Sequence, residues 1–579
     1  MSGRFSGNAG RIVVPTSGWA LAGFIVGLIT LVGVIVVGAV IGAKVYQTAG
    51  DVSFVRDSTV DTLAPAPLGP ACGSDVHAIP RREAAYNLRN ERSFANYARP
   101  VPCHTNNGDE ALYAPVYFAS FSKGMPHDSL GHVDPVAYAA LLKAASSWVP
   151  GDFDAIPQAP GSVRDFTNPQ AGLGYVLQGA DGHSFFQPPA PTFASAEQAG
   201  EMVELYWMAY LRDVPFALYP TSARAIEAAG SLGALTDFRG LKPVTPANLF
   251  RGTSPGCDVG PYISQFMYMT CNFGANSIDQ TLTPPLPEQD FMTNWTTYLA
   301  QQRAQPPEGS IQYNLTRRHI ITGRDLAHWV HVDVLFQAYF TAMLILLEKG
   351  APLKPGIPYQ TSELNQMGFG TFGGPDVSAF ATISATGALK AVWFQKWLVH
   401  RRLRPEVFAA RVHNHLTSVY SYPLHADVTG ATAILTHLFN QHGSYLLPQV
   451  FPEGSPLHPS YGAGHATVAG AAVTILKALF KEDWVLPNPV MPSPDDGGIT
   501  LVPLSPPASL TVGGELNKLA NNVAIGRNLA GVHWRSDATA SLFLGEQVAI
   551  ELLKDLQKTY TEPFSGFTFT SFAGTVIQL

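Results

Sequence analysis

The chain has 579 residues, of which 46% are apolar and only 14% are charged, and its formal net charge is −7. A typical soluble domain carries about 25% charged residues, so this composition predicts a large buried core under a sparsely charged surface. It excludes a collagen, a coiled coil, a disulfide mini-protein and a multi-span transporter, and the lack of any basic block argues against a nucleic-acid partner.

The first expected element is an uncharged apolar run over residues 18–43, which follows a short tail of residues 1–17. About 20 apolar residues span a bilayer, so the run predicts a single-pass anchor. Arg4 and Arg11 precede it, which favours a cytoplasmic tail and an exported, extracytoplasmic body. Two alternatives stay open, namely a cleaved signal peptide that would leave a secreted protein, and a buried core helix.

Residues 44–75 are Pro-rich and predict an extended linker, so residues 76–579 are expected to form one catalytic body. The chain has four cysteines, and an even number in an exported protein favours disulfides. The simplest pairs are Cys257–Cys271 and Cys72–Cys103. Four buried thiols are the alternative.

The body is predicted to be all-α, with helices joined by long ordered loops. Apolar residues recur at helical spacing in segments 136–149, 197–213, 289–304, 324–348, 377–402, 428–441, 465–481, 515–530 and 535–556. Short β-hairpins are expected near residues 500–504 and at the C-terminus. Helices separated by Pro/Gly loops predict helix-on-helix packing.

Two segments of the C-terminal third carry groups that suit an anion site. WFQKWLVHRRLRPEV holds Lys396 and Arg404, and Pro405 is expected to end or restart the helix after them. HPSYGAGHATV contains a Gly-rich turn at Gly464, which leads into an apolar helix that begins near His465. The free N–H groups at such a helix start bind anions.

A third segment, GRNLAGVHWRSD, contains Arg527, His533 and Asp537, and the Asp537 carboxylate is placed to hold the second ring nitrogen of His533. Each segment alone is typical of a helix end or a cap. Together they offer three cations, a backbone nest and two histidines, which is what a multiply charged tetrahedral oxyanion requires. One histidine would ligate or attack the central atom, and the other would move protons.

These segments resemble the motifs K-x(6–7)-R-P, P-S-G-H and R-x-x-x-G-x-H-x-x-x-D of the vanadium-dependent haloperoxidase and PAP2-type acid phosphatase superfamily. Seven residues separate Lys396 from Arg404, and His458 stands seven residues before His465. Both features look like the algal and cyanobacterial bromoperoxidase branch. The resemblance covers roughly residues 75–560 and implies the helical bundle of that superfamily and a homo-oligomer.

The resemblance also implies a vanadate cofactor, with His533 as the axial ligand of vanadium. The vanadate oxygens would be held by four groups: Lys396, Arg404, Arg527 and the N–H of Gly464. His465 would deprotonate hydrogen peroxide and Lys396 would polarise it. A halide, expected to be bromide, would then be oxidised to hypohalous acid, which halogenates small organic acceptors.

Three neighbouring positions qualify this interpretation. His458 is expected to modulate halide oxidation and Trp393 to lie near the halide, although each could instead be core packing. The family serine of P-S-G-H is Ala463 here. Loss of one charge-assisted hydrogen bond costs about 1.5–3 kcal/mol, so weaker vanadate binding is expected rather than none.

The sequence does not exclude two other functions. The first is a PAP2-type acid phosphatase, in which His533 forms a phosphohistidine and His465 protonates the leaving group. The second is a catalytically weak oxyanion-binding protein, which Ala463 makes conceivable. A further cluster, His328, His331 and Asp333, is expected to make only structural hydrogen bonds.

Overall fold

The computed structural model describes residues 77–360 and 365–579, and residues 88–579 form one compact unit. The predicted anchor at 18–43, the linker at 44–75 and Cys72 lie outside the described residues. The α-helices are α2 (Ala78–Ala98), α3 (Asp109–Leu112), α4 (Pro135–Ser147), α5 (Pro150–Asp154), α6 (Ala196–Leu211), α7 (Ala223–Gly233), α8 (Trp295–Gln302), α9 (Gly323–Trp329), α10 (Gln337–Glu348), α11 (Gly374–Phe394), α12 (Pro405–Leu416), α13 (Ala426–Thr429), α14 (Thr432–His442), α15 (Gly464–Leu479), α16 (Val512–Leu529) and α17 (Arg535–Leu556).

Strands are few and short. Antiparallel two-stranded hairpins join β1 (Cys271–Phe273) to β2 (Asn276–Ile278), β3 (Val490–Pro492) to β4 (Leu501–Pro503), and β5 (Thr568–Thr570) to β6 (Val576–Gln578). The last two are the hairpins expected from the sequence, and β1–β2 was not predicted. The all-α class is confirmed.

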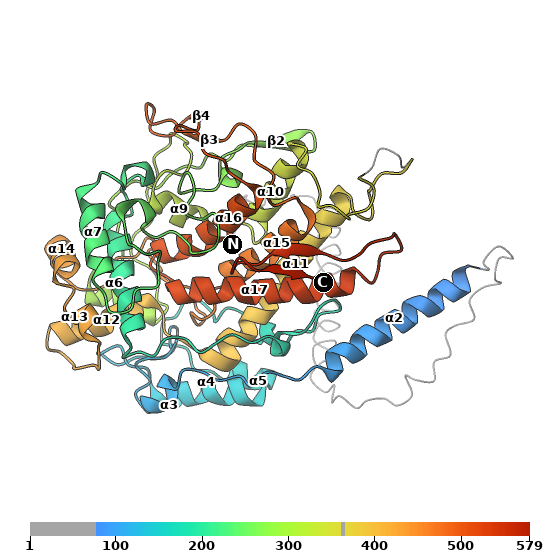
Figure 1. Cartoon of the computed structure of the whole chain (residues 1–579). Coiled ribbons are helices and arrows are strands. Elements are labelled where there is room, and N and C mark those ends of the chain that lie inside the picture. The colour runs from blue at the N-terminus through green and yellow to red at the C-terminus, as the bar shows by residue number, and fades with distance from the viewer. Residues whose placement is uncertain (1–76, 361–364) are drawn as a thin grey trace, which may run out of the picture. The chain divides into compact units, whose positions relative to one another are not determined.

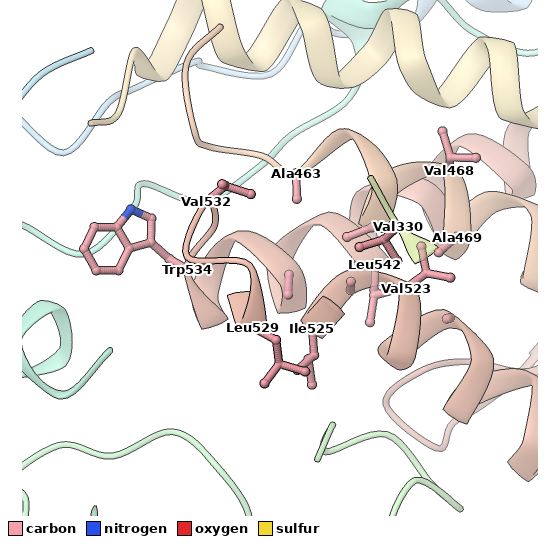
Figure 2. Packing of buried hydrophobic residues seen from close by; sticks show 14 of the residues in the cluster. Val330, Ala463, Val468, Ala469, Val523, Ile525, Leu529, Val532, Trp534 and Leu542 are labelled. Carbon is pink, nitrogen blue, oxygen red and sulfur yellow. The ribbon is translucent and has the colours of Figure 1, made fainter. Parts of the chain in front are cut away.

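The centre of the unit is built from α11, α15, α16 and α17, which contact one another (Figure 1). Their inner faces share one apolar core, in which Val468 of α15 lies with Val523 of α16 and Leu542 of α17 (Figure 2). Helix α17 approaches α15 closely at two glycines. A Cβ on Gly545 would lie 2.0 Å from the Thr467 carbonyl oxygen, and one on Gly470 would lie 2.2 Å from that of Leu542. Glycine at both positions therefore sets the helix spacing.

Several predicted helices are shorter or divided. The segment 324–348 splits into α9 and α10, with an irregular stretch at 330–336, and 428–441 splits into α13 and α14 at Gly430. The predicted helix 289–304 begins only at Trp295, because the Asn294 side chain caps it by accepting from the N–H of Thr297. Apolar periodicity continued through these breaks, so the pattern alone did not reveal them.

Among the described residues, one helical segment, Gly374–His400, is long and apolar enough to cross a membrane, but 56% of its apolar window is buried inside the protein. It comprises α11 and the π-helix η7 (Gln395–His400), and it packs as a core helix.

The predicted disulfide Cys257–Cys271 is wrong. Both residues are free, buried thiols with different neighbours: the Cys257 carbonyl accepts from Arg251, whereas Cys271 belongs to β1. Burial raises the pKa of the Cys257 thiol to about 12 and that of Cys271 to about 11, so both stay protonated. Cys103 is exposed and forms no disulfide with another described residue, and its predicted partner Cys72 lies outside the described residues.

Candidate oxyanion site

Lys396 and Arg404 do not share one continuous helix. Lys396 lies in η7, the chain then turns at Arg401 in the left-handed region with φ 39°, and Arg404 is the N-cap of α12. Pro405 occupies the first helical position and forces the preceding residue into an extended conformation, which Arg404 adopts with ψ 156°. The helix therefore restarts at Pro405, as the sequence allowed.

The site contains three buried cations, none of which forms an ion pair with a carboxylate of the described residues. Lys396 Nζ donates to the carbonyls of Pro459 and Ser460, at 2.8 and 3.1 Å. Arg527 Nη1 donates to a carbonyl oxygen at 3.0 Å, and its buried Nε has no partner among the described residues. Arg404 donates only to carbonyls and to imidazole nitrogens. None of the three forms an ion pair within the described part of the chain, so the site has positive charge left for an anion.

Burial is the main electrostatic effect on these groups. It lowers the pKa of Arg404 to about 9 and that of Arg527 to about 10, and it lowers the pKa of Lys396 well below its usual value. Repulsion by Arg404 and Arg527 lowers the pKa of Lys396 further, and that by Arg527 lowers the pKa of Arg404, whereas the Asp537 carboxylate raises the pKa of both groups and outweighs Arg527 at Arg404. An anion bound among the three would reverse that repulsion, so the site is built for a ligand of opposite charge.

His533 is held in one tautomer. Its Nδ1 donates to Oδ2 of Asp537 at 2.8 Å, while its Nε2 accepts from Nη1 of Arg404 at 2.9 Å, because a guanidinium can only donate. Burial, followed by the nearby cations, lowers the pKa of His533 well below its usual value. The imidazole is therefore neutral and presents an Nε2 lone pair beside the cations, which suits a metal ligand or a nucleophile.

His465 lies in the first turn of α15, and 29% of its side chain is exposed. Its Nε2 lies 3.0 Å from Oδ1 of Asp333, in the irregular stretch between α9 and α10. An ionised carboxylate only accepts, so Nε2 carries the proton and Nδ1 is left as the proton acceptor. The break in the predicted helix 324–348 places Asp333 in contact with His465, a partner that the sequence did not predict.

The other two members of that cluster have different partners. His331 stacks on Phe451, with ring centroids 3.6 Å apart, and its Nε2 lies 2.9 Å from Glu453. His328 is buried beside Tyr313, and burial lowers its pKa to about 4. Neither makes a hydrogen bond to the cations or to the two site histidines in the described structure.

His458 and Trp393 adjoin the cations. Nδ1 of His458 accepts from Nη2 of Arg404 at 3.0 Å, and its ring centroid lies 4.8 Å from that of Trp393. Lys396 Nζ lies 5.6 Å from the Trp393 ring centroid. Burial, and then the charges of Lys396 and Arg404, lower the pKa of His458 well below its usual value, so the ring is neutral and its Nε2 carries the proton.

Ala463 and Gly464 form the start of α15. Ala463 is the fully buried N-cap and provides no side-chain cap, while its own N–H donates to Oγ of Ser541 at 2.8 Å. The first-turn N–H groups of α15 thus have no capping hydroxyl. A Cβ on Gly464 would lie 3.1 Å from the Trp393 ring, so glycine lets the indole pack against the turn.

Sequence reasoning missed three residues that contact the site. The Ser460 hydroxyl donates to Oδ2 of Asp537, Arg402 Nη1 donates to the other Asp537 oxygen at 2.8 Å, and Asp333 contacts His465. Ser460 and Arg402 stand inside the motif segments, so their polar type at a buried position was a usable signal. The partners of all three are 77 to 135 positions away, which only the folded chain reveals.

The comparisons decide the family. A vanadium-dependent bromoperoxidase of Corallina officinalis is 36% identical to this chain, and the match covers 86% of the chain and 98% of that protein. The chain belongs to the vanadium-dependent bromoperoxidase family. A vanadium-dependent bromoperoxidase of Ascophyllum nodosum is 34% identical, over 82% of this chain and 88% of its own length.

Fold and domain comparisons agree with this membership. The homohexameric second vanadate-dependent bromoperoxidase of Ascophyllum nodosum superposes with a TM-score of 0.83 at 30% identity, covering 90% of this chain and 95% of that one. Residues 377–562 match the family described as the VCPO second helical-bundle domain. In this bromoperoxidase family member, that range contains the three motif segments, whereas Asp333 reaches the site from outside it.

Proposed function

We propose that this chain is a vanadate-dependent haloperoxidase that oxidises bromide with hydrogen peroxide and a proton to hypobromous acid and water. The observation that carries the proposal is that three buried cations without an ion pair among the described residues act on the neutral imidazole of His533, where Arg404 donates to Nε2, in a chain of this family. A tetrahedral oxyanion fits this donor set, because it offers charge to each cation and an electrophilic centre to the imidazole.

Each residue then has a role. His533 Nε2 would ligate vanadium, while the N–H of Gly464 and the three cations, Lys396, Arg404 and Arg527, would hold the oxygens of vanadate. When bound, vanadate supplies a Lewis acid that keeps its oxidation state. His465 Nδ1 would take the proton of hydrogen peroxide, with Asp333 holding the protonated ring. Lys396 would polarise the peroxide.

Two neighbours would act on the halide. His458 presents a protonated Nε2 because Arg404 occupies its Nδ1, so it would donate to an incoming bromide or to a peroxide oxygen. Trp393 packs beside His458 and Lys396, and its indole N–H is already bound to the Thr167 carbonyl at 3.0 Å. The halide would therefore meet the indole ring rather than its N–H.

Export and assembly belong to this proposal as well. We propose that residues 18–43 anchor the chain and leave its catalytic unit outside the cytoplasm, and that copies of the chain associate. One relative is a homohexamer, and α2 of this chain exposes 68% of Phe94 and 86% of Tyr97, apolar surface that a second copy would cover.

The test is a bromination assay on protein freed of bound oxyanions, with hydrogen peroxide and bromide, in the presence and absence of added vanadate. Bromination of a phenolic dye only with vanadate supports the proposal, and His533→Ala should abolish it. Hydrolysis of a phosphate ester without vanadate would instead support a phosphatase that uses His533 as nucleophile. Absence of activity in both assays would instead support an oxyanion-binding protein without catalytic activity.

A further inference from the structure

The carboxylate of Asp537 is fixed from both sides. Its Oδ2 accepts from Nδ1 of His533 at 2.8 Å and from the backbone N–H of Trp534 at 3.1 Å. Its Oδ1 accepts from Nη1 of Arg402 at 2.8 Å. The side chain of Asp537 is fully buried, so water does not contribute to its orientation. The direction in which His533 presents Nε2 thus depends on a carboxylate that Arg402 holds together with the Ser460 hydroxyl and the Trp534 N–H.

Arg402 is itself anchored by a distant helix. Its Nη2 donates to Oε2 of Glu201 at 2.8 Å and to Oε1 of Gln198 at 2.7 Å, both on α6. Its guanidinium carbon lies 5.0 Å from the ring centroid of Trp534, the residue after His533. A planar fork can bridge two carboxylates at once, whereas a lysine ammonium is a single point charge.

Arg402 differs from the cations of the site in one respect. Its charge is matched by two ion pairs, to Glu201 and to Asp537, at 2.8 Å each, whereas Lys396, Arg404 and Arg527 form none among the described residues. The positive charge of its guanidinium is therefore already neutralised by carboxylates. It does not add to the charge that attracts an anion to the site. The Arg402 side chain also contacts Ser536 and the ring of Tyr461, and it reaches His533 through Asp537.

The geometry points to Arg402 as a positioning residue that links α6 to Asp537 and so holds the lone pair of His533 beside the cations of the site. This inference rests on the proposed function, because only a metal oxyanion makes a bond to Nε2. Arg402 should therefore matter for vanadate, which is bound by cations and imidazole together. It should not matter for inorganic phosphate, which is bound by the cations alone.

The experiment compares Arg402→Lys with wild type in two titrations, of vanadate followed by 51V NMR and of inorganic phosphate followed by calorimetry. Loss of a partner that orients a metal ligand typically costs about 10- to 100-fold in metal affinity. We expect the vanadate Kd of Arg402→Lys to rise at least about tenfold. Its phosphate Kd should stay within about twofold of wild type, because the cation set is intact.

Arg401→Lys is the matched control. Arg401 is the adjacent residue, is also buried, and forks onto both oxygens of Glu110 at 2.7 and 2.6 Å, without a bond to Asp537. Its Kd values for both oxyanions should equal those of wild type. If Arg402→Lys does not fold, Glu201→Gln replaces it, since it removes the charged anchor of Arg402 on α6 and leaves Gln198 and Asp537 in place.

The results distinguish a failure of the positioning role of Arg402 from a failure of the proposed haloperoxidase function. A folded Arg402→Lys or Glu201→Gln that binds vanadate as wild type does overturns the inference, as does an equal loss of affinity for vanadate and phosphate. Failure of the wild-type chain to bind vanadate at all overturns the proposed function instead. A selective loss of vanadate affinity, absent in Arg401→Lys, supports the positioning role.

Discussion

The Asp333 carboxylate lies 3.0 Å from Nε2 of His465, although the two residues are 132 positions apart in the chain. The contact gives the exposed edge of the site a histidine–carboxylate pair of its own. A second such pair, His533 with Asp537, lies in the buried part of the site. The outer pair suits proton transfer, since it touches solvent, whereas the inner pair suits ligation.

The outer pair leads to a prediction for Asp333→Asn. The amide no longer stabilises a protonated His465, so proton abstraction from hydrogen peroxide should weaken. General acid–base catalysis contributes about 10²–10⁴-fold, and we expect kcat to fall at least about tenfold at saturating bromide. Steady-state kinetics with varied peroxide measures this, and Glu227→Gln, which removes the partner of His437 away from the site, is the control. An unchanged kcat would refute the role of Asp333.

Ala463→Ser should restore the hydroxyl that this chain lacks. At the uncapped N-terminus of α15 a serine accepts from a first-turn N–H and can donate its own proton to a vanadate oxygen. We expect vanadate affinity to rise about 10- to 100-fold. Stability should rise by about 1 kcal/mol from the cap alone. Vanadate titration and urea denaturation measure the two effects separately, and no change in either would show that the hydroxyl does not matter in this pocket.

His458→Phe should separate halide oxidation from cofactor binding. The phenyl ring removes the protonated Nε2, yet Arg404 keeps its bonds to the His458 backbone carbonyl at 2.9 and 3.0 Å. We expect kcat/KM for bromide to fall about tenfold, because the substitution removes one hydrogen bond to the halide or the peroxide. Vanadate affinity should be nearly unchanged. His458→Gln, which keeps a donor and an acceptor, should lose less. Equal losses for both substitutions would instead indicate a packing role for the ring.

His400 should make the protein sensitive to acid. Both its ring nitrogens are buried without a partner among the described residues, and burial lowers its pKa to about 3. An unfolded chain protonates this imidazole below about pH 6.5. Between these values the unfolded state binds more protons, so stability is complete above about pH 6.5 and falls as the pH drops towards 3.

The variant His400→Leu lacks this titration. Its stability relative to wild type should therefore improve on acidification, by up to about 1.4 kcal/mol for each pH unit below 6.5. Urea denaturation of both proteins at about pH 7.5 and about pH 5 measures the difference. A difference that does not depend on pH would show that His400 is protonated equally in the folded and unfolded chain.

The sequence by itself determined the helical class and which residues could form an oxyanion site, because helical periodicity and the types of Lys396, Arg404, His465, Arg527 and His533 are local information. Local information also predicted the hydrogen bond from His533 to Asp537, since the two are four residues apart. It could not identify the irregular stretch that carries Asp333 to His465, because apolar spacing runs through it without interruption.

The tertiary structure decided which distant groups complete the site. Arg402 reaches Asp537 and Glu201 only because the fold brings α6 next to the start of α17, where the Ser536 hydroxyl donates to Glu201. Helices α15 and α17 pack closely because Gly470 and Gly545 have no side chain at the contact. The same packing leaves Cys257 and Cys271 among different neighbours as free thiols. Such contacts depend on how side-chain volumes fill a common core, a property of the whole chain that no short segment encodes.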